Sequence, residues 1–107
     1  MKNDFDEVAS LFVLVRCADN ASAVRHLLAK YASAKVALNA SKSEWRSLGL
    51  SEKACARMSV PDLIRLEQDL EWCDQQRHYV IPWHSPDYPE LLRQSDNPPP
   101  VLFVAGN

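Results

Sequence analysis

The stretch WHSPDYPELL, residues 83–92, and the stretch DNPPPVLFVAGN, residues 96–107, contain five of the seven prolines of the chain. A proline pushes the preceding residue toward extended backbone, so residues 97–100 are predicted to form a rigid bridge. The apolar run at 101–105 predicts a buried strand, and residues 79–82 predict another. Residues 87–93 predict a brief helix with Pro89 in its first turn. The tail is therefore predicted to be an ordered α/β unit.

Upstream of this tail, apolar residues recur at helical spacing. The spacing predicts helices at residues 5–15, 22–31, 33–38, 41–48, 51–58 and 59–76. Polar residues able to cap these helices stand at their starts: Asp4, Ser33, Ser41 and Ser51, with Ser41 and Glu44 spaced as a capping box. The last helix is opened by Ser59-x-Pro61-Asp62.

The last predicted helix is the longest, and its apolar stripe should face the core. The stripe consists of Leu63, Leu66, Leu70 and Cys73, widened by Ile64 and Trp72. The predicted fold is therefore mostly α. A small helical bundle spans residues 1–77, and a short α/β appendage with one or two strands spans residues 78–107.

Composition restricts the classes of function. The net charge is −2, but residues 1–57 carry nine basic and six acidic residues while residues 58–107 carry three and eight. This mild asymmetry is weaker than the basic footprint of a dedicated nucleic-acid binder. Three widely spaced cysteines predict reduced thiols rather than disulfides or zinc. With no membrane span or signal sequence, we expect a cytoplasmic protein.

Catalytic and cofactor motifs are missing from the sequence. Gly49 and Gly106 are the only glycines, which excludes the glycine-rich phosphate loops. The carboxylates of Asp69, Glu71 and Asp74 are interpreted as a solvated helix face. The sequence therefore predicts neither an enzyme nor a cofactor or metal site.

The turn at residues 48–51 has two interpretations. In helix-hairpin-helix modules, a tight glycine turn directs backbone amides at a DNA phosphate, assisted by the next helix N-terminus. The candidate DNA-binding residues are then Gly49, Ser51, Lys53 and Arg57. The alternative is an ordinary helix corner with a glycine cap. The earlier turn at residues 16–21 is interpreted as structural, because it lacks glycine and Asp19 would repel a phosphate.

The tail also resembles a known family. Trp83, Pro86, Tyr88, Pro89 and Leu92, followed by Pro99-Pro100-x-Leu102-Phe103-x-x-Gly106-Asn107, resemble the entry to the Rossmann-like domain of the DNA-processing protein A family (DprA, also called Smf). Residues 48–53 resemble the sterile-alpha-motif-like, helix-hairpin-helix-related domain that precedes it. The resemblance implies that residues 78–107 are a linker and the first strands of a truncated Rossmann-like domain.

The resemblance also implies a role. Proteins of this family act in natural transformation, where competent cells take up DNA for homologous recombination. They bind incoming single-stranded DNA and help load the recombinase RecA. The family's DNA contacts lie mainly in the remainder of the Rossmann-like domain, so none is carried over to a residue here. This chain is expected to be an accessory module for protein–protein or inter-domain contacts, with self-association possible; the alternative is direct, weak DNA binding through the Gly49 turn.

The residues of the tail that match the family are expected to serve interdomain packing. They are Trp83, Tyr88, Pro89, Leu92, Pro99, Pro100, Leu102 and Phe103. Trp83 and Tyr88 in particular are predicted to dock on the long helix, since leaving both exposed would forgo about 2 kcal/mol each.

Overall fold

A computed structural model describes residues 5–75 and 77–105. Within these residues the elements follow one another as α1 (Glu7–Cys17), α2 (Ala21–Tyr31), α3 (Ala34–Leu38), α4 (Lys42–Ser47), α5 (Glu52–Ser59), α6 (Leu63–Asp74), β1 (His78–Pro82), α7 (Glu90–Arg93) and β2 (Val101–Ala105). The fold is mostly helical with a small two-stranded sheet, as the sequence predicted.

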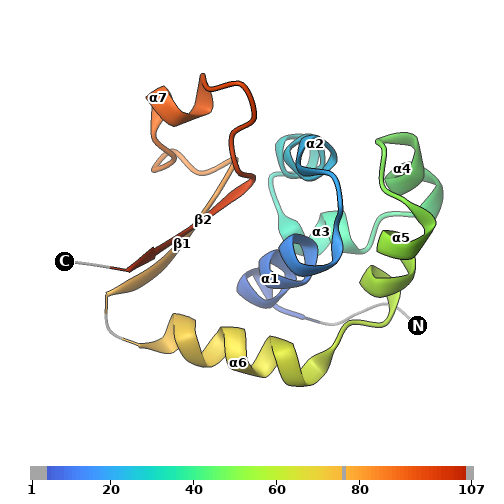
Figure 1. Cartoon of the computed structure of the whole chain (residues 1–107), viewed down its shortest axis with the longest axis horizontal. Helices are drawn as coiled ribbons and strands as arrows, with labels where there is room; N and C mark the ends of the chain where they lie inside the picture. Colours follow the sequence, from blue (N-terminus) through green and yellow to red (C-terminus); the bar gives the residue numbers. More distant parts are fainter. Residues whose placement is uncertain (1–4, 76, 106–107) are drawn as a thin grey trace.

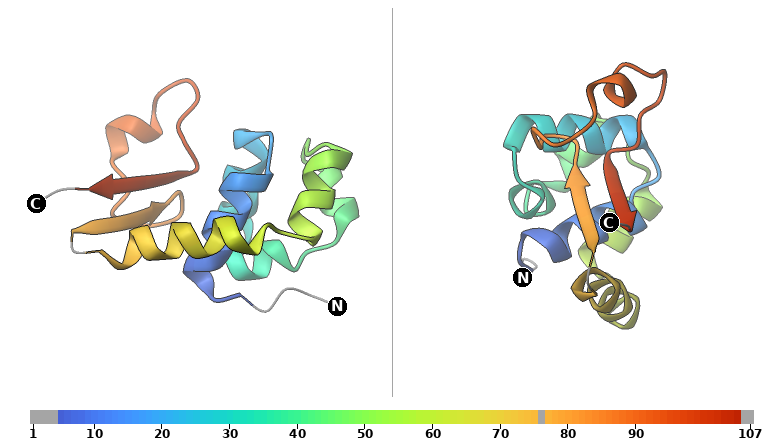
Figure 2. Two further views of the ribbon diagram at one scale, coloured as in Figure 1. Left: turned by 60° about the horizontal axis from the view of Figure 1, so that its bottom comes forward. Right: turned by 90° about the vertical axis from the view of Figure 1, so that its left-hand side faces the viewer.

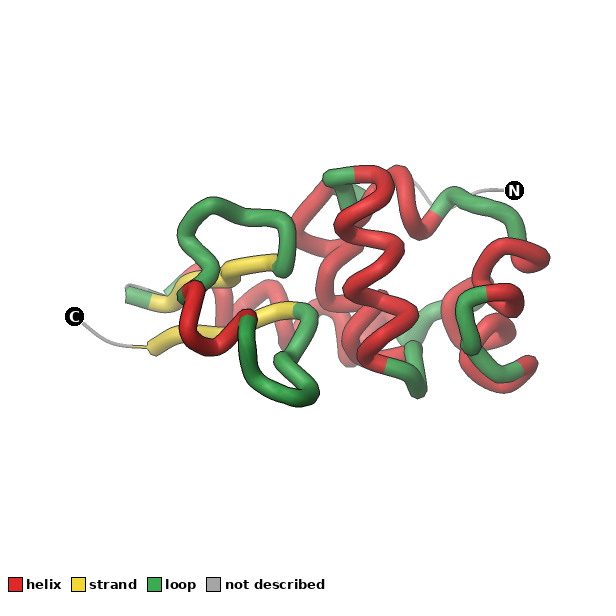
Figure 3. Tube along the Cα trace, turned by 90° about the horizontal axis from the view of Figure 1, so that it is seen from above, coloured by secondary structure: helices red, strands yellow, loops and turns green. Residues whose placement is uncertain are grey.

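The molecule is elongated, with principal extents of 40 × 32 × 19 Å. Figure 1 shows α1 to α5 gathered at one end and the strands with α7 at the other, while α6 runs along one side of both. Figures 2 and 3 show the same arrangement from other directions, with the strands remote from α4 and α5. None of the helices in residues 5–75 and 77–105 has the length and apolar character needed to cross a bilayer.

Side-chain caps define where most of the helices begin. The caps whose side chains accept a backbone N–H from the first turn are Asp6, Asn20, Ser33, Ser41, Ser51 and Asp62. Each such cap contributes about 1 kcal/mol. The prediction of caps at Ser33, Ser41 and Ser51 is confirmed. The long helix was predicted to open at Ser59-x-Pro61-Asp62, but Ser59 ends α5, and α6 begins at Leu63 with Asp62 as its cap. The first helix is capped by Asp6, whereas the predicted cap Asp4 lies outside the described residues.

The capping box at Ser41 forms only in part. Ser41 Oγ accepts a hydrogen bond from the Glu44 backbone N–H at 3.2 Å. The Glu44 carboxylate instead accepts hydrogen bonds from Tyr31 Oη and Lys30 Nζ, both at 2.5 Å. These two donors, Lys30 foremost, hold the pKa of Glu44 below its ordinary value and tie the start of α4 to the end of α2.

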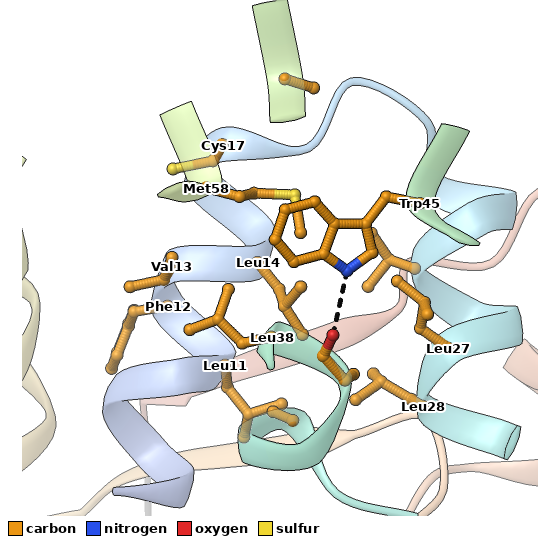
Figure 4. Packing of buried hydrophobic residues seen from close by; sticks show 14 of the residues in the cluster. Leu11, Phe12, Val13, Leu14, Cys17, Leu27, Leu28, Leu38, Trp45 and Met58 are labelled. Atoms are coloured by element: carbon orange, nitrogen blue, oxygen red, sulfur yellow. Dashed lines mark hydrogen bonds between the residues drawn. The ribbon is translucent and has the colours of Figure 1, made fainter. Parts of the chain in front are cut away.

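The hydrophobic core lies among α1, α2, α3 and α5. Leu14, Leu27, Leu28 and Met58 have no exposed surface, and burial of one such side chain is worth about 1.5–3 kcal/mol. Trp45 closes the core from α4 and donates its indole N–H to the Ala37 carbonyl at 3.0 Å, as Figure 4 shows. The indole therefore contributes apolar contact without leaving a buried donor unpaired.

The prediction for the apolar stripe of α6 is wrong at the start of the helix. Leu66 is buried, but Leu63 is 59% exposed and Ile64 is 73% exposed. The reason is that α6 packs mainly against α1 and β1, so it has a narrow contact face. Leu70, Trp72 and Cys73 in the later turns are partly buried against the core. The helix ends at Asp74, and residue 76, its predicted end, lies outside the described residues.

The tail forms an antiparallel ribbon. Strand β1 pairs with β2 so that Val80 lies opposite Phe103 and Tyr79 lies opposite Val104. The second strand was predicted to be buried, but in β2 only Val101 is buried, and residues 103–105 are exposed. Helix α7 begins at Glu90, so Pro89 occupies the N-cap position rather than the first turn.

Candidate functional site

The turn at Gly49 is a tight helix ending. The Gly49 N–H donates to the Arg46 carbonyl at 3.0 Å, and the Leu50 N–H donates to the Trp45 carbonyl at 3.2 Å. This is the hydrogen-bond pattern of a Schellman motif. Gly49 has φ of +110°, and a Cβ placed there would lie 2.5 Å from Asn20 Nδ2. Backbone conformation and close approach both require glycine here.

The first interhelical turn lies against this glycine. Asn20 Nδ2 donates to the Gly49 carbonyl at 3.3 Å, and the Ser51 backbone N–H donates to Asp19 Oδ1 at 3.3 Å. Hydrogen bonds from Ser51, first from its side chain and then from its backbone, lower the pKa of Asp19. A carboxylate therefore already stands at the N-terminus of α5, where a DNA phosphate would have to approach.

Three of the four candidate DNA-binding residues lie at the turn or in the first turn of α5, and the fourth is engaged elsewhere. Gly49 and Ser51 share the turn, and Lys53 is exposed in the first turn of α5. The Arg57 guanidinium is bound elsewhere, because its Nη2 and Nε donate to the Cys17 carbonyl at 2.9 and 3.2 Å. This arginine satisfies the last carbonyl of α1. DNA binding through the turn stays a prediction. The Asp19 carboxylate at the N-terminus of α5 would repel a DNA phosphate there.

The proline-rich tail is organised around an arginine that carries no recognisable signal in the sequence. Arg93 lies over the rings of Trp83 and Tyr88, with 4.6 and 4.9 Å to the two ring centroids. It also donates to the carbonyls of Trp83 at 2.8 Å and Ser85 at 3.3 Å. The Tyr88 hydroxyl donates to the Pro99 carbonyl at 2.6 Å. Cation–π contacts and hydrogen bonds together order the segment between the two strands.

The docking partner predicted for the two aromatics is wrong. Trp83 and Tyr88 pack edge to face at 5.1 Å, and the neighbour that Trp83 meets in the bundle is Arg25 of α2, 5.8 Å from its ring. Arg25 also donates to Asn97 Oδ1 at 3.0 Å and to the Pro98 carbonyl at 2.5 Å. The segment between the two strands is thus fastened to α2 through Arg25, whereas the contact with α6 is made by the strands.

The ribbon itself contacts α1 and α6 through one face. Phe103 stacks on Phe12 with a centroid distance of 5.2 Å and meets Trp72 edge to face at 6.2 Å. Val80, opposite Phe103, packs against the same core. Phe103 is nevertheless 41% exposed, so the helices cover it only in part.

The opposite face of the ribbon is also apolar. Side chains alternate along a strand, so the residues on this outer face are Tyr79 and Ile81 of β1 with Leu102 and Val104 of β2. Tyr79 is 52% exposed and Val104 is 36% exposed. A ribbon that is apolar on both faces is typical of a sheet buried on both faces.

The other residues expected to serve interdomain packing have mixed surroundings. Tyr88 is buried; Trp83, Leu92, Pro100 and Leu102 are half-buried; and Pro89 and Pro99 are exposed. Leu91, which was not among the candidates, is 85% exposed on α7. The structure therefore brings most of the family-matching residues into one end of the molecule.

The predicted solvated carboxylate face needs one correction. Asp69 is buried and accepts hydrogen bonds from Arg16, with Nε to Oδ2 at 3.0 Å and Nη2 to Oδ1 at 2.6 Å. This bidentate pair raises the pKa of Arg16 and joins α1 to α6. Glu71 and Asp74 are exposed, as predicted. Among residues 5–75 and 77–105, no group of histidine, cysteine and carboxylate side chains could hold a metal ion.

Comparison of the chain with protein-family models, with curated proteins and with solved structures found no match.

Proposed function

We propose that the chain is an accessory, non-enzymatic module of a DNA-processing protein of the kind it resembles. In this proposal the parent protein binds incoming single-stranded DNA in the cytoplasm during natural transformation and helps load RecA. The helical bundle with its ribbon serves protein–protein or inter-domain contacts. The family assignment is supported by the motifs at residues 83–107, and the contact role by the geometry of the ribbon.

The observation that carries the contact role is the apolar outer face of the ribbon, formed by Tyr79, Ile81, Leu102 and Val104. A two-stranded ribbon of this size is marginal in water without a further layer or further strands. The helices supply a layer on one face only. A sheet or domain packed on the outer face would supply the second layer. It would also remove exposed apolar surface from water.

The edge of β2 supports the same role. Residues 101–105 contain no charged residue and no proline, whereas strands that remain at the edge of a sheet are generally protected by such residues. Within the described residues β2 has one strand neighbour, β1. We infer that its other edge accepts a further strand.

The alternative, DNA binding through the Gly49 turn, is less well supported. Asp19 accepts the Ser51 N–H, and Arg57 is bound to the Cys17 carbonyl. The two predicted DNA-binding cations are Lys53 and Arg57. With Arg57 engaged, Lys53 is the one of the two that has no hydrogen bond or ion pair with a described residue. A single exposed lysine supplies little of the phosphate neutralisation on which DNA affinity depends.

Fluorescence anisotropy of labelled single- and double-stranded oligonucleotides tests this choice. At low salt we expect the chain to leave the anisotropy unchanged at micromolar concentrations. Micromolar binding that weakens with salt, and that Lys53→Glu reduces, would overturn the contact role in favour of the turn. Lys42→Glu provides the matched control, because Lys42 is equally a surface lysine but lies on α4.

A further inference from the structure

Residues 83–100 form a closed loop at the end of the ribbon. The Trp83 N–H donates to the Pro100 carbonyl at 2.8 Å, directly beyond the rung that pairs Pro82 with Val101. The chain therefore enters and leaves the loop at one place, and Figure 1 shows the loop, with α7, beyond the ends of both strands. A compact loop whose ends meet can turn as one body without pulling its strands apart.

The loop is held together by its own side chains. Arg93 lies over the rings of Trp83 and Tyr88, and it donates to the Trp83 carbonyl. The Tyr88 hydroxyl donates to the Pro99 carbonyl, which ties the middle of the loop to its exit. The three prolines at residues 98–100 stiffen this exit, because each proline fixes its own φ. None of these contacts involves the helical bundle, so the loop can keep its shape when it leaves the bundle.

Arg25 of α2 fastens this loop to the bundle. Its Nη1 donates to Asn97 Oδ1 at 3.0 Å and to the Pro98 carbonyl at 2.5 Å, and its guanidinium lies 5.8 Å from the centroid of the Trp83 ring. Both acceptors are uncharged, and Arg25 has no ion pair within residues 5–75 and 77–105. Hydrogen bonds from a guanidinium to neutral acceptors are weaker than those to a carboxylate. The attachment is therefore weaker than an ion pair at the same place would be.

The loop buries little of itself against the rest of the molecule. Trp83 is partly buried against the core and Pro98 is buried. Most of the other residues of the loop face solvent, including Leu91 of α7, which is 85% exposed. Segments with few buried apolar contacts open locally at a low free energy, without unfolding of the domain. An open form of this loop would expose the Trp83 ring and Pro98.

We propose that the loop of residues 83–100 is a lid and that Arg25 is its latch. When Arg25 releases it, the lid turns as a rigid body on the ends of β1 and β2 and exposes Trp83 and Pro98. The open form is a minor one, on the order of 0.1–10% of the molecules. The device uses neither the outer face of the ribbon nor the Gly49 turn, so it does not rest on the function proposed above.

Residual dipolar couplings of the backbone amides test the lid, because they report whether two parts of a molecule share one orientation. In the parent chain a single alignment should fit the amides of α1 to α5 and of the loop. In Arg25→Met the couplings of the loop should fall about twofold or more below that fit. The Tyr88 and Arg93 amides, which donate to carbonyls inside the loop, should keep their protection from hydrogen exchange. Arg65→Met, at an exposed arginine of α6, is the control and should keep a single alignment.

Asn97→Asp tests the latch in the opposite direction, because it offers Arg25 a charged acceptor. In urea denaturation this change should raise the folding equilibrium constant about threefold in the parent chain and leave it unchanged in Arg25→Met. A single alignment for helices and loop in Arg25→Met would overturn the proposal. Loss of exchange protection inside the loop of that variant would also overturn it, because the loop would then melt rather than turn. An Asn97→Asp effect that is equal with and without Arg25 would show that Arg25 is not the latch.

Discussion

Replacement of Gly49 by alanine should destabilise the chain by about 3 kcal/mol. A non-glycine residue at φ of +110° is strained by about 1–3 kcal/mol. The new Cβ would also lie 2.5 Å from Asn20 Nδ2, so the Asn20 side chain must move. Asn20 Oδ1 accepts the Ala23 N–H at 3.2 Å as the cap of α2, and loss of that cap costs about 1 kcal/mol.

Urea denaturation followed by far-UV circular dichroism measures this cost. The two contributions can be separated with Asn20→Ser, because serine keeps a capping oxygen and lacks the amide nitrogen that clashes. Asn20 Cγ lies 3.6 Å from the position that a Cβ on Gly49 would take, which is an ordinary contact. In the Asn20→Ser background, Gly49→Ala should therefore cost about 1 kcal/mol less than in the parent chain. A cost below about 0.5 kcal/mol in the parent background, the range of an ordinary surface substitution, would show that position 49 tolerates a side chain and does not require glycine.

Three further changes probe the tail, the turn and the ribbon. Arg93→Met removes the guanidinium between two aromatic rings and two carbonyls; it should loosen residues 83–100 by about 2 kcal/mol, seen as faster amide exchange there. The pKa of Asp19 is lowered from 3.8 by Ser51, so its contribution to stability is present above about pH 4 and is lost as the pH falls through the lowered value; Asp19→Asn should flatten the acid limb of a pH–stability profile. Val104→Lys should suppress concentration-dependent association in sedimentation velocity, because a charge on the outer face opposes strand addition.

Each of these predictions has a contradicting result. Arg65→Met, at an exposed arginine outside the tail, is the control for Arg93→Met, and equal exchange rates in the two variants would remove the stacking argument. An acid limb unchanged by Asp19→Asn would show that the hydrogen bonds from Ser51 do not persist in solution. Association that survives Val104→Lys would place self-association on another surface.

Local signals in the sequence predicted the helical half well. Serines before apolar repeats were sufficient to place the starts of α3, α4 and α5, because a cap acts within a single turn. The glycine at residue 49 was recognised as a helix end for the same reason. The positions of the strands were predicted from the prolines and from the end of the helical spacing of apolar residues after the long helix.

Long-range pairing could not be predicted in this way. The Asp69 carboxylate is buried because Arg16, remote in sequence, reaches it. Arg25 and Arg93 gave no local signal of their contacts with the tail, since a surface arginine and a stacking arginine look alike in sequence. The first turn of α6 is exposed because no element packs there, and an apolar residue does not reveal whether its neighbour is solvent or a partner.

On the function proposed here, this module acts through the outer face of its ribbon and not through the Gly49 turn. The most direct test is the transformation frequency of cells in which the gene encoding this chain carries Val104→Lys or Lys53→Glu. Both residues are exposed, so both variants should accumulate at the parental level. We expect the frequency to fall at least about tenfold for Val104→Lys, equivalent to about 1.4 kcal/mol of lost contact, and to stay unchanged for Lys53→Glu. A fall confined to Lys53→Glu would contradict this expectation.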